Sequence, residues 1–156
     1  MKKTVDKSII YKNFLIREYR RGDFNHIGHL WTITELCDSG RGDDEKTIED
    51  SIKLGGTLLI MEEIVTRKVC GTSWLTFDGR RIHLHHFGIL PEFQGLGLSK
   101  FLLKKSLDFV KKKGAQVKLE VHKNNTRAVN LYKKYGFKYL GDYEVLIIRD
   151  IENLQG

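Results

Sequence analysis

Residues 89–99 read Ile89-Leu90-Pro91-Glu92-Phe93-Gln94-Gly95-Leu96-Gly97-Leu98-Ser99. They follow an apolar run and precede a long amphipathic pattern, which predicts a turn between a strand and a helix. Glycines let a ligand approach the backbone amides closely, and the first turn of a helix favours an anion. The stretch therefore predicts a phosphate-binding turn, with an ordinary strand-to-helix turn as the alternative. It matches neither the GxGxxG nor the GxxxxGKS/T pattern, so no dinucleotide-binding or P-loop site is indicated.

The apolar periodicity around this turn predicts an alternation of strands and helices. Asp23 is expected to cap a first helix that extends to about Leu36. A β-α-β unit is expected over residues 82–121, with its two strands parallel and a right-handed crossover. The remaining pattern predicts strands at residues 14–20, 57–63, 69–77, 82–90, 117–121 and 137–149, and helices at residues 45–54, 97–113 and 125–135.

The composition fits one globular α/β domain, residues 1–156, with residues 1–10 as a flexible N-terminal segment. Cys37 and Cys70 are far apart, which is typical of reduced thiols that fill a core, and the chain is expected to be cytoplasmic. No apolar run is long enough to span a membrane. The net charge of +7 comes from scattered lysines, so a nucleic-acid-binding module is a rival hypothesis but not the preferred one.

The turn resembles a known motif. Gln94-x-x-Gly97-x-Ser99, preceded by Ile89-x-Pro91, is similar to the coenzyme-binding motif of the GNAT superfamily of N-acetyltransferases, although Ser99 stands where the family has glycine or alanine. The resemblance implies that the strand through Phe87 and Ile89 binds the pantetheine arm of acetyl-CoA. It further implies that the pyrophosphate is bound by the backbone of Gln94, Gly95, Leu96, Gly97, Leu98 and Ser99.

A second stretch, Asn125-Thr126-Arg127-Ala128-Val129-Asn130-Leu131-Tyr132 followed by Gly136-Phe137, resembles another signature of the same family. Asn125 is expected to cap a helix, and Tyr132, seven residues on, lies on about the same face. The resemblance implies that both line the coenzyme and that Tyr132 is the general acid. A core aromatic residue with a solvated hydroxyl is the alternative for Tyr132.

Two groups of candidates exist for the base. Glu120 lies twelve residues before Tyr132, a spacing similar to that in family members that acetylate a ribosomal protein's N-terminus, where this glutamate is the base. His83 and His85 share one strand face, and histidine titrates near neutral pH. An exposed charge is the alternative for Glu120, and packing is the alternative for the histidines. A metal site at the histidines is disfavoured because no matched ligand spacing accompanies them.

The resemblance implies the GNAT acyl-CoA N-acyltransferase fold: a mixed, mostly antiparallel, twisted sheet flanked by helices and splayed between the strands of His83 and Glu120. It implies transfer of acetyl from acetyl-CoA, without a metal, to a primary amine of a small molecule or a peptide N-terminus. The resemblance implies that the residues from Ser39 to Glu45 and the turn Gly141-Asp142-Tyr143 lie near the acceptor, where Asp43 and Asp44 either attract an amine or cap a helix. A homodimer and a non-catalytic acyl-CoA sensor remain open.

Overall fold

The computed structural model describes residues 9–37 and 42–154. The chain divides into two compact units, residues 1–120 and 121–156, and each is described by itself. Of the N-terminal segment expected to be flexible, residues 1–8 lie outside the described residues, whereas Ile9 and Ile10 belong to a strand. Part of the expected acceptor segment, residues 38–41, also lies outside them.

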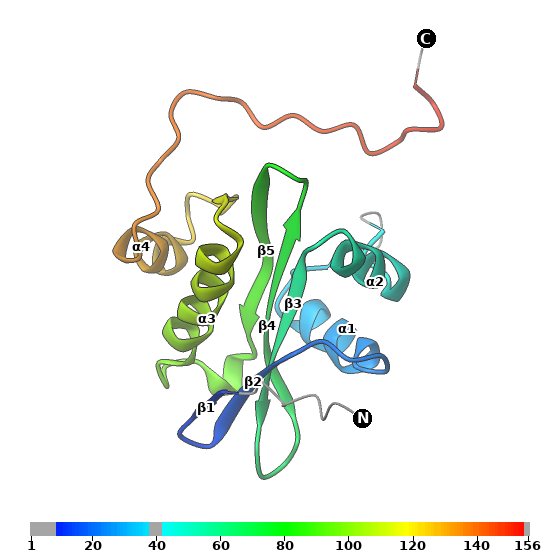
Figure 1. The fold of residues 1–156 in the computed structure, drawn as a ribbon. Helices are drawn as coiled ribbons and strands as arrows, with labels where there is room; N and C mark the ends of the chain where they lie inside the picture. The colour runs from blue at the N-terminus through cyan, green and yellow to red at the C-terminus, as the bar shows by residue number, and fades with distance from the viewer. Residues whose placement is uncertain (1–8, 38–41, 155–156) are drawn as a thin grey trace. The chain divides into compact units, whose positions relative to one another are not determined.

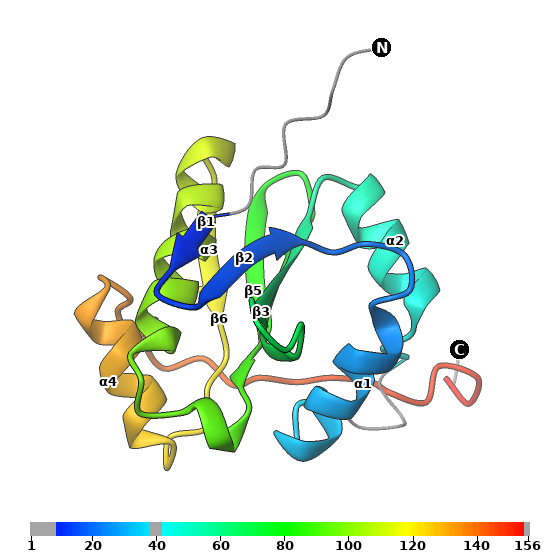
Figure 2. The ribbon, with the colours of Figure 1, turned by 90° about the horizontal axis from the view of Figure 1, so that it is seen from below.

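The first unit contains a sheet whose strands are neighbours in their chain order (Figures 1 and 2). Every adjacent pair is antiparallel except the last, which is parallel. This mixed, mostly antiparallel α/β arrangement confirms the predicted fold class. The strands are β1 (Ile9–Tyr11), β2 (Phe14–Glu18), β3 (Thr57–Glu63), β4 (Val69–Phe77), β5 (Arg81–Ile89) and β6 (Gln116–Leu119).

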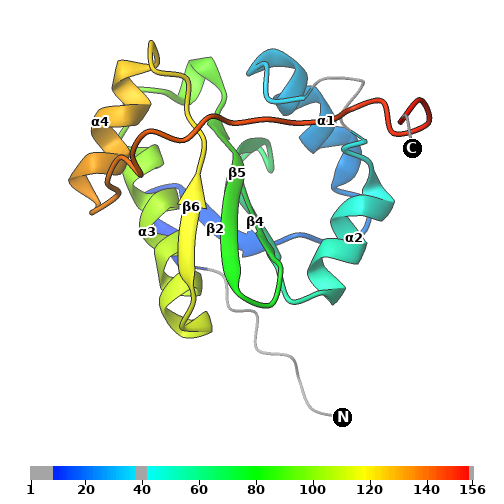
Figure 3. The ribbon, with the colours of Figure 1, turned by 90° about the horizontal axis from the view of Figure 1, so that it is seen from above.

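Helices cover both faces of this sheet. Helices α1 (Phe24–Ile33) and α2 (Glu45–Lys53) lie on one face, and α3 (Leu98–Lys113) lies on the other (Figure 3). α3 forms the crossover between the parallel strands β5 and β6, as the β-α-β pattern predicts. It ends at Gly114, whose left-handed conformation suits a helix C-terminus. On the first face, the core is a cluster of buried side chains: Ile27, Leu30, Trp31, Ile48, Leu58, Ile60, Val69, Trp74 and Leu90.

Asp23 occupies the N-cap position of α1, as expected, but its side chain caps no amide of the helix. Its carboxylate instead binds the Arg17 guanidinium and the Arg20 backbone N–H. Helix α1 also stops at Ile33, before Leu36. The charge of Arg17 on the adjacent strand is a stronger partner for a carboxylate than a helix amide, and local sequence does not reveal that it lies there.

Strand β6 pairs with β5 along its whole length, but this pairing covers only the first part of β5. Their register runs from Arg81 opposite Gln116 to Leu84 opposite Leu119, and then the pairing stops. Strand β5 continues to Ile89, whereas Glu120 directly follows the end of β6. Beyond Leu84 and Leu119 the ladder ends, as expected for a sheet that is splayed between the strand of His83 and the residues at Glu120.

The second unit contains α4 (Thr126–Lys134), preceded by Asn125, whose side chain accepts a hydrogen bond from Ala128 N at 3.2 Å. The strand predicted at residues 137–149 is not formed: the described part of this unit has no strand after α4. Its apolar side chains, including Tyr143, Val145 and Ile147, are exposed. Alternating apolar residues indicate a strand, but a strand forms only where a partner supplies backbone hydrogen bonds.

Candidate active site

The turn between β5 and α3 is open and has the geometry of an anion-binding turn. A short 3-10 helix, η1 (Pro91–Phe93), leads into it, and Gly95 and Gly97 both have φ of +81°. Gln94 Nε2 donates to Ile89 O at 3.0 Å, which ties the turn to the end of β5. The turn is exposed, but Leu98 at the start of α3 is 2% exposed. The helix start is thus anchored while its amides face accessible space.

Gly97 is required by backbone conformation rather than by packing. A Cβ atom there would meet only Tyr11 Oη, at 3.9 Å, so the folded chain leaves room for a side chain. Its left-handed φ is costly for other residues, and it sits at the N-cap of α3 without a side-chain cap. The first amides of a helix have no intrahelical acceptors, so this end can bind an anion such as a pyrophosphate.

Strand β5 carries a bulge that brings two consecutive histidines to one face. The register with β4 shifts between Thr72 and Trp74, so His86 and Phe87 together oppose a single residue. His86 has a φ of +47°, and its carbonyl accepts a hydrogen bond from Thr72 Oγ1 at 2.8 Å. Because the bulge offsets the usual alternation, both His85 and His86 pack on the side of the sheet that α1 covers.

These histidines belong to a continuous chain of hydrogen bonds. His86 Nε2 lies 2.9 Å from Asp43 Oδ2, and His86 Nδ1 lies 2.9 Å from His85 Nδ1. His85 Nε2 lies 3.2 Å from Thr76 Oγ1. The indole rings of Trp31 and Trp74 pack against them, with Trp31 4.3 Å from the His86 ring and Trp74 4.7 Å from the His85 ring, measured between centroids.

Burial keeps two of the histidines neutral. Burial and then the neighbouring His86 and His83 lower the pKa of His85 to about 3. The pKa of His83 is also lowered, by burial and by the Lys118 ammonium, with Glu120 acting in the opposite direction. Glu120 is therefore close enough to act on His83 electrostatically, and its Oε1 lies 3.7 Å from Lys118 Nζ at an exposed position.

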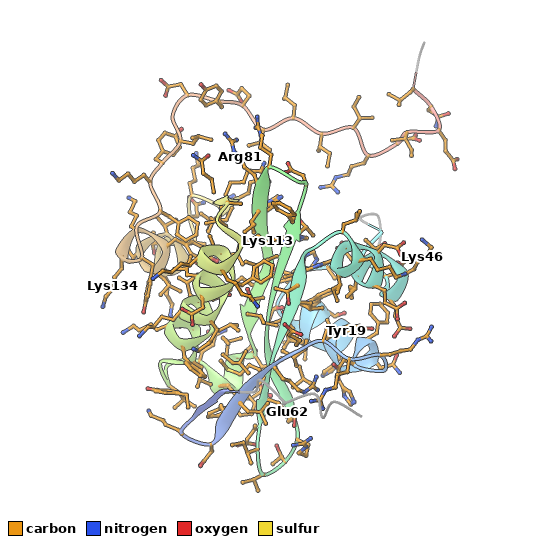
Figure 4. The ribbon with its side chains drawn as sticks, in the orientation of Figure 1. Tyr19, Lys46, Glu62, Arg81, Lys113 and Lys134 are labelled. Carbon is orange, nitrogen blue, oxygen red and sulfur yellow. The ribbon has the colours of Figure 1, made fainter. Side chains whose placement is uncertain are left out.

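A pocket of about 420 Å³ opens beside the paired ends of β4, β5 and β6. Thr76, His83 and Lys118 share one face there, because His83 is paired with both of the others. Arg81, labelled in Figure 4, begins β5 at the same end. The pocket is lined by Leu54, Thr76, Phe77, Asp78, Arg80, Arg81, Ile82, His83 and Lys118.

Within the second unit, Tyr132 is the buried residue of α4. Its ring contacts Phe137 at 5.6 Å between centroids, and burial raises the pKa of its phenol to about 12. Asn125 lies seven residues earlier, so the two side chains leave α4 on about the same face. The phenol therefore stays protonated at neutral pH.

The structure brings His83, His85 and Glu120 to the region where β5 and β6 diverge. It also adds two residues, His86 and Thr76, that the sequence patterns do not single out as site residues. Asp43, which the sequence places near the acceptor, contacts His86 instead of capping a helix. The only sequence signal for His86 is the His85-His86 pair, which interrupts the alternation of a strand. Among the described residues, no cluster of histidine, cysteine and carboxylate side chains has the geometry of a metal site. None of the described helices is long and apolar enough to cross a membrane.

Comparisons with known proteins show the family and the fold of the chain. The model of the acetyltransferase (GNAT) family matches residues 24–137. The thialysine N-epsilon-acetyltransferase of Sus scrofa is 36% identical over 150 residues, covering 83% of this chain and 87% of that protein. A GNAT acetyltransferase from Staphylococcus aureus Mu50 superposes with a TM-score of 0.71 at 19% identity, over 80% of this chain and 83% of that one. A GNAT acetyltransferase from Elizabethkingia anophelis with acetyl-CoA bound superposes with a TM-score of 0.58 at 19% identity, over 82% and 78%. The chain therefore belongs to the acetyltransferase (GNAT) family.

Proposed function

We propose that this acetyl-CoA-dependent N-acetyltransferase moves the acetyl group directly to a primary amine of a small molecule or a peptide N-terminus. The observation that supports this most directly is the open glycine turn at the start of α3, next to the divergence of β5 and β6. Direct attack requires amine and thioester to be held together in one cleft, and two diverging strands provide such a place.

Acetyl-CoA binding is assigned to the backbone of residues 94–99 for the pyrophosphate and to Phe87 and Ile89 for the pantetheine arm. Side-chain substitutions at exposed Gln94 or Leu96 then matter less than substitutions that fill the space above Gly97. In the second unit, the likeness of residues 125–137 to the family signature assigns Asn125 and Tyr132 to coenzyme binding. A metal has no assigned role in this reaction, since the thioester is already activated towards an amine.

The acid–base steps follow from the proton balance. The acceptor enters as an ammonium ion and loses one proton before attack and a second one after the C–N bond forms. The C–S bond breaks, and the departing thiolate takes up one proton. We assign the second proton of the amine to Glu120, with His85 and then His83 as the alternatives, and the proton for the thiolate to Tyr132.

Release of free coenzyme A, measured over a panel of small amines and peptides, tests the function. An acceptor-dependent release far above the hydrolysis rate supports it. Acetyl-CoA binding without release on any acceptor would favour the acyl-CoA sensor instead. Salt-sensitive binding to nucleic acid, with no response to coenzyme A, would favour the nucleic-acid-binding module. Cytoplasmic location and a homodimer stay predictions, which cell fractionation and sedimentation velocity test.

A further inference from the structure

The hydrogen-bond chain of Asp43, His86, His85 and Thr76 has a direction that its first member imposes. An aspartate carboxylate at neutral pH only accepts hydrogen bonds, so His86 Nε2 must donate to Asp43 Oδ2. In neutral His86 the other nitrogen, Nδ1, is then an acceptor, and His85 Nδ1 must donate to it. That leaves His85 Nε2 as an acceptor, which the Thr76 hydroxyl satisfies by donating.

The two ends of this chain lie in different surroundings. Thr76 lines the pocket beside His83, at the paired ends of the strands. Asp43 lies at the other end, in the segment before α2, with its side chain 11% exposed. Between them, Trp31 and Trp74 pack on the histidine rings and limit the access of water. The chain thus joins the pocket to a nearly buried carboxylate.

We propose that Thr76, His85, His86 and Asp43 form a proton exit that removes the first proton of the acceptor's ammonium group before attack. The proposal rests on the proposed transferase function. Thr76 Oγ1 takes the ammonium proton as its own proton passes to His85 Nε2. His85 Nδ1 gives its proton to His86 Nδ1, and the positive charge comes to rest on His86 beside Asp43. One proton moves overall, no electrons are transferred, and the imidazolium later returns the proton to solvent.

The charges around the chain favour this division of roles. His85 is half-buried, and burial with the neighbouring His86 and His83 lowers its pKa, so it passes a proton on rather than keeping it. His86 faces the Asp43 carboxylate, which is the group that stabilises an imidazolium there. At the pocket end, three lining cations outnumber the lining carboxylate of Asp78, which disfavours a further positive charge and so assists its loss from the ammonium; the cations are Arg80, Arg81 and Lys118. Glu120, beside Lys118, is left for the second proton.

The test uses Asp43→Asn and two acceptors that differ only in the basicity of the amine, such as a parent amine and its β-fluorinated analogue. With the parent amine, kcat/KM should fall about 10- to 100-fold, at the lower end of acid–base effects. The acid limb of the pH profile should move to lower pH, because imidazolium His86 loses its counter-charge. With an analogue that is already neutral at the assay pH, the loss should shrink to less than about threefold, because no ammonium proton has to be removed.

Asp44→Asn is the matched control. Asp44 Oδ1 caps α2 by accepting from Thr47 N at 2.7 Å, so its loss should lower stability and leave the pH profile unchanged. His86→Gln should lose as much as Asp43→Asn, and the double variant should lose no more than His86→Gln alone. His86 has a positive φ, which glutamine would also have to adopt. If His86→Gln fails to fold for that reason, the comparison of the two acceptors in Asp43→Asn still tests the proton exit.

An equal loss on both acceptors would overturn the proton exit and leave Asp43 a structural residue. A wild-type profile in Asp43→Asn would overturn it as well. If the wild-type protein released no coenzyme A with any acceptor, the proposed transferase function itself would be wrong. That result differs from a wild-type enzyme that is active while Asp43→Asn shows no dependence on the acceptor, which would overturn the proton exit alone.

Discussion

Arg17 and Asp23 form a bidentate ion pair, in which Arg17 Nη1 lies 2.7 Å from Asp23 Oδ2 and Arg17 Nη2 lies 2.9 Å from Asp23 Oδ1. The same guanidinium donates from Nε and Nη2 to Glu62 Oε2, at 3.1 and 3.0 Å. Arg17 is on β2, Glu62 is on β3, and Asp23 opens α1, so one side chain joins three elements of the first unit. The Arg17 and Glu62 side chains are 9% and 3% exposed.

Arg17→Met should lower the free energy of unfolding by about 3–5 kcal/mol, because Asp23 and Glu62 lose the guanidinium that they share, and Glu62 keeps only the largely exposed Arg67. Arg21→Met is the control: Arg21 pairs with Glu49 but its side chain is 85% exposed, so the loss should be about 1 kcal/mol or less. Urea unfolding at neutral pH measures both. Equal losses in the two variants would show that the buried pair contributes no more than a surface pair.

The stabilisation from Asp23 should depend on pH. Burial alone would raise the pKa of Asp23, but hydrogen bonds from Arg17 and the Arg20 amide outweigh it and lower the pKa. A carboxyl group with a depressed folded-state pKa adds stability above its unfolded value, about 3.9, and loses it as the pH falls through the folded-state value. The gap in unfolding free energy between wild type and Arg17→Met should therefore narrow from pH 7 to pH 3. A constant gap would contradict this linkage.

Saturating acetyl-CoA should stabilise the protein, by about 2.7 kcal/mol at 100 times its dissociation constant. This stabilisation is measured as the rise in melting temperature on adding acetyl-CoA. Gly97→Leu should abolish that rise, because the leucine side chain occupies the space where the pyrophosphate approaches the amides. Gly114→Leu is matched to it, since Gly114 also has a positive φ, +69°, and open surroundings, but at the opposite end of α3. Both variants place a leucine at a positive φ, so both carry backbone strain. If acetyl-CoA still raised the melting temperature of Gly97→Leu, the turn would not be part of the coenzyme site.

Glu120→Gln should lower kcat/KM by about 10²–10⁴ and leave the affinity for acetyl-CoA nearly unchanged. The carboxylate is exposed and lies beside Lys118, so the substitution should not affect folding. Asp108→Asn, an exposed carboxylate paired with Lys105 on α3, is the control and should keep wild-type kinetics. If Glu120→Gln kept full activity and His85→Gln or His83→Gln lost it, the base would be a histidine and not Glu120.

Tyr132→Phe should fold normally, bind acetyl-CoA and lose about 10- to 10³-fold in kcat, because it keeps the ring and deletes the donor. Since burial raises the pKa of Tyr132 to about 12, no loss of rate from its ionisation is expected below about pH 10. Tyr135→Phe, at the C-cap of the same helix, should leave kcat unchanged. Wild-type kcat in Tyr132→Phe, under conditions where chemistry limits the rate, would leave Tyr132 a packing residue.

The sequence by itself determined most of the elements of the first unit and their type. Strands 57–63 and 69–77 are observed with the predicted bounds, and α3 ends where Gly114 predicts. These features depend on the period of apolar residues and on glycines at helix ends, which are local properties of the chain. The turn that is predicted to bind the coenzyme is recognisable for the same reason, since a turn that brings amides to one ligand needs contiguous residues.

Only the tertiary structure decided which distant side chains meet. Asp43 and His86 are 43 residues apart, and they contact each other because a bulge turns His86 towards the face where the segment before α2 lies. Asp23 binds Arg17 instead of its own helix, and residues 137–149 form no strand despite their alternating pattern. In each case the outcome depends on a partner supplied by another part of the chain. Hydrogen bonds and charge pairs form with whichever group is nearest in space, which local periodicity does not encode.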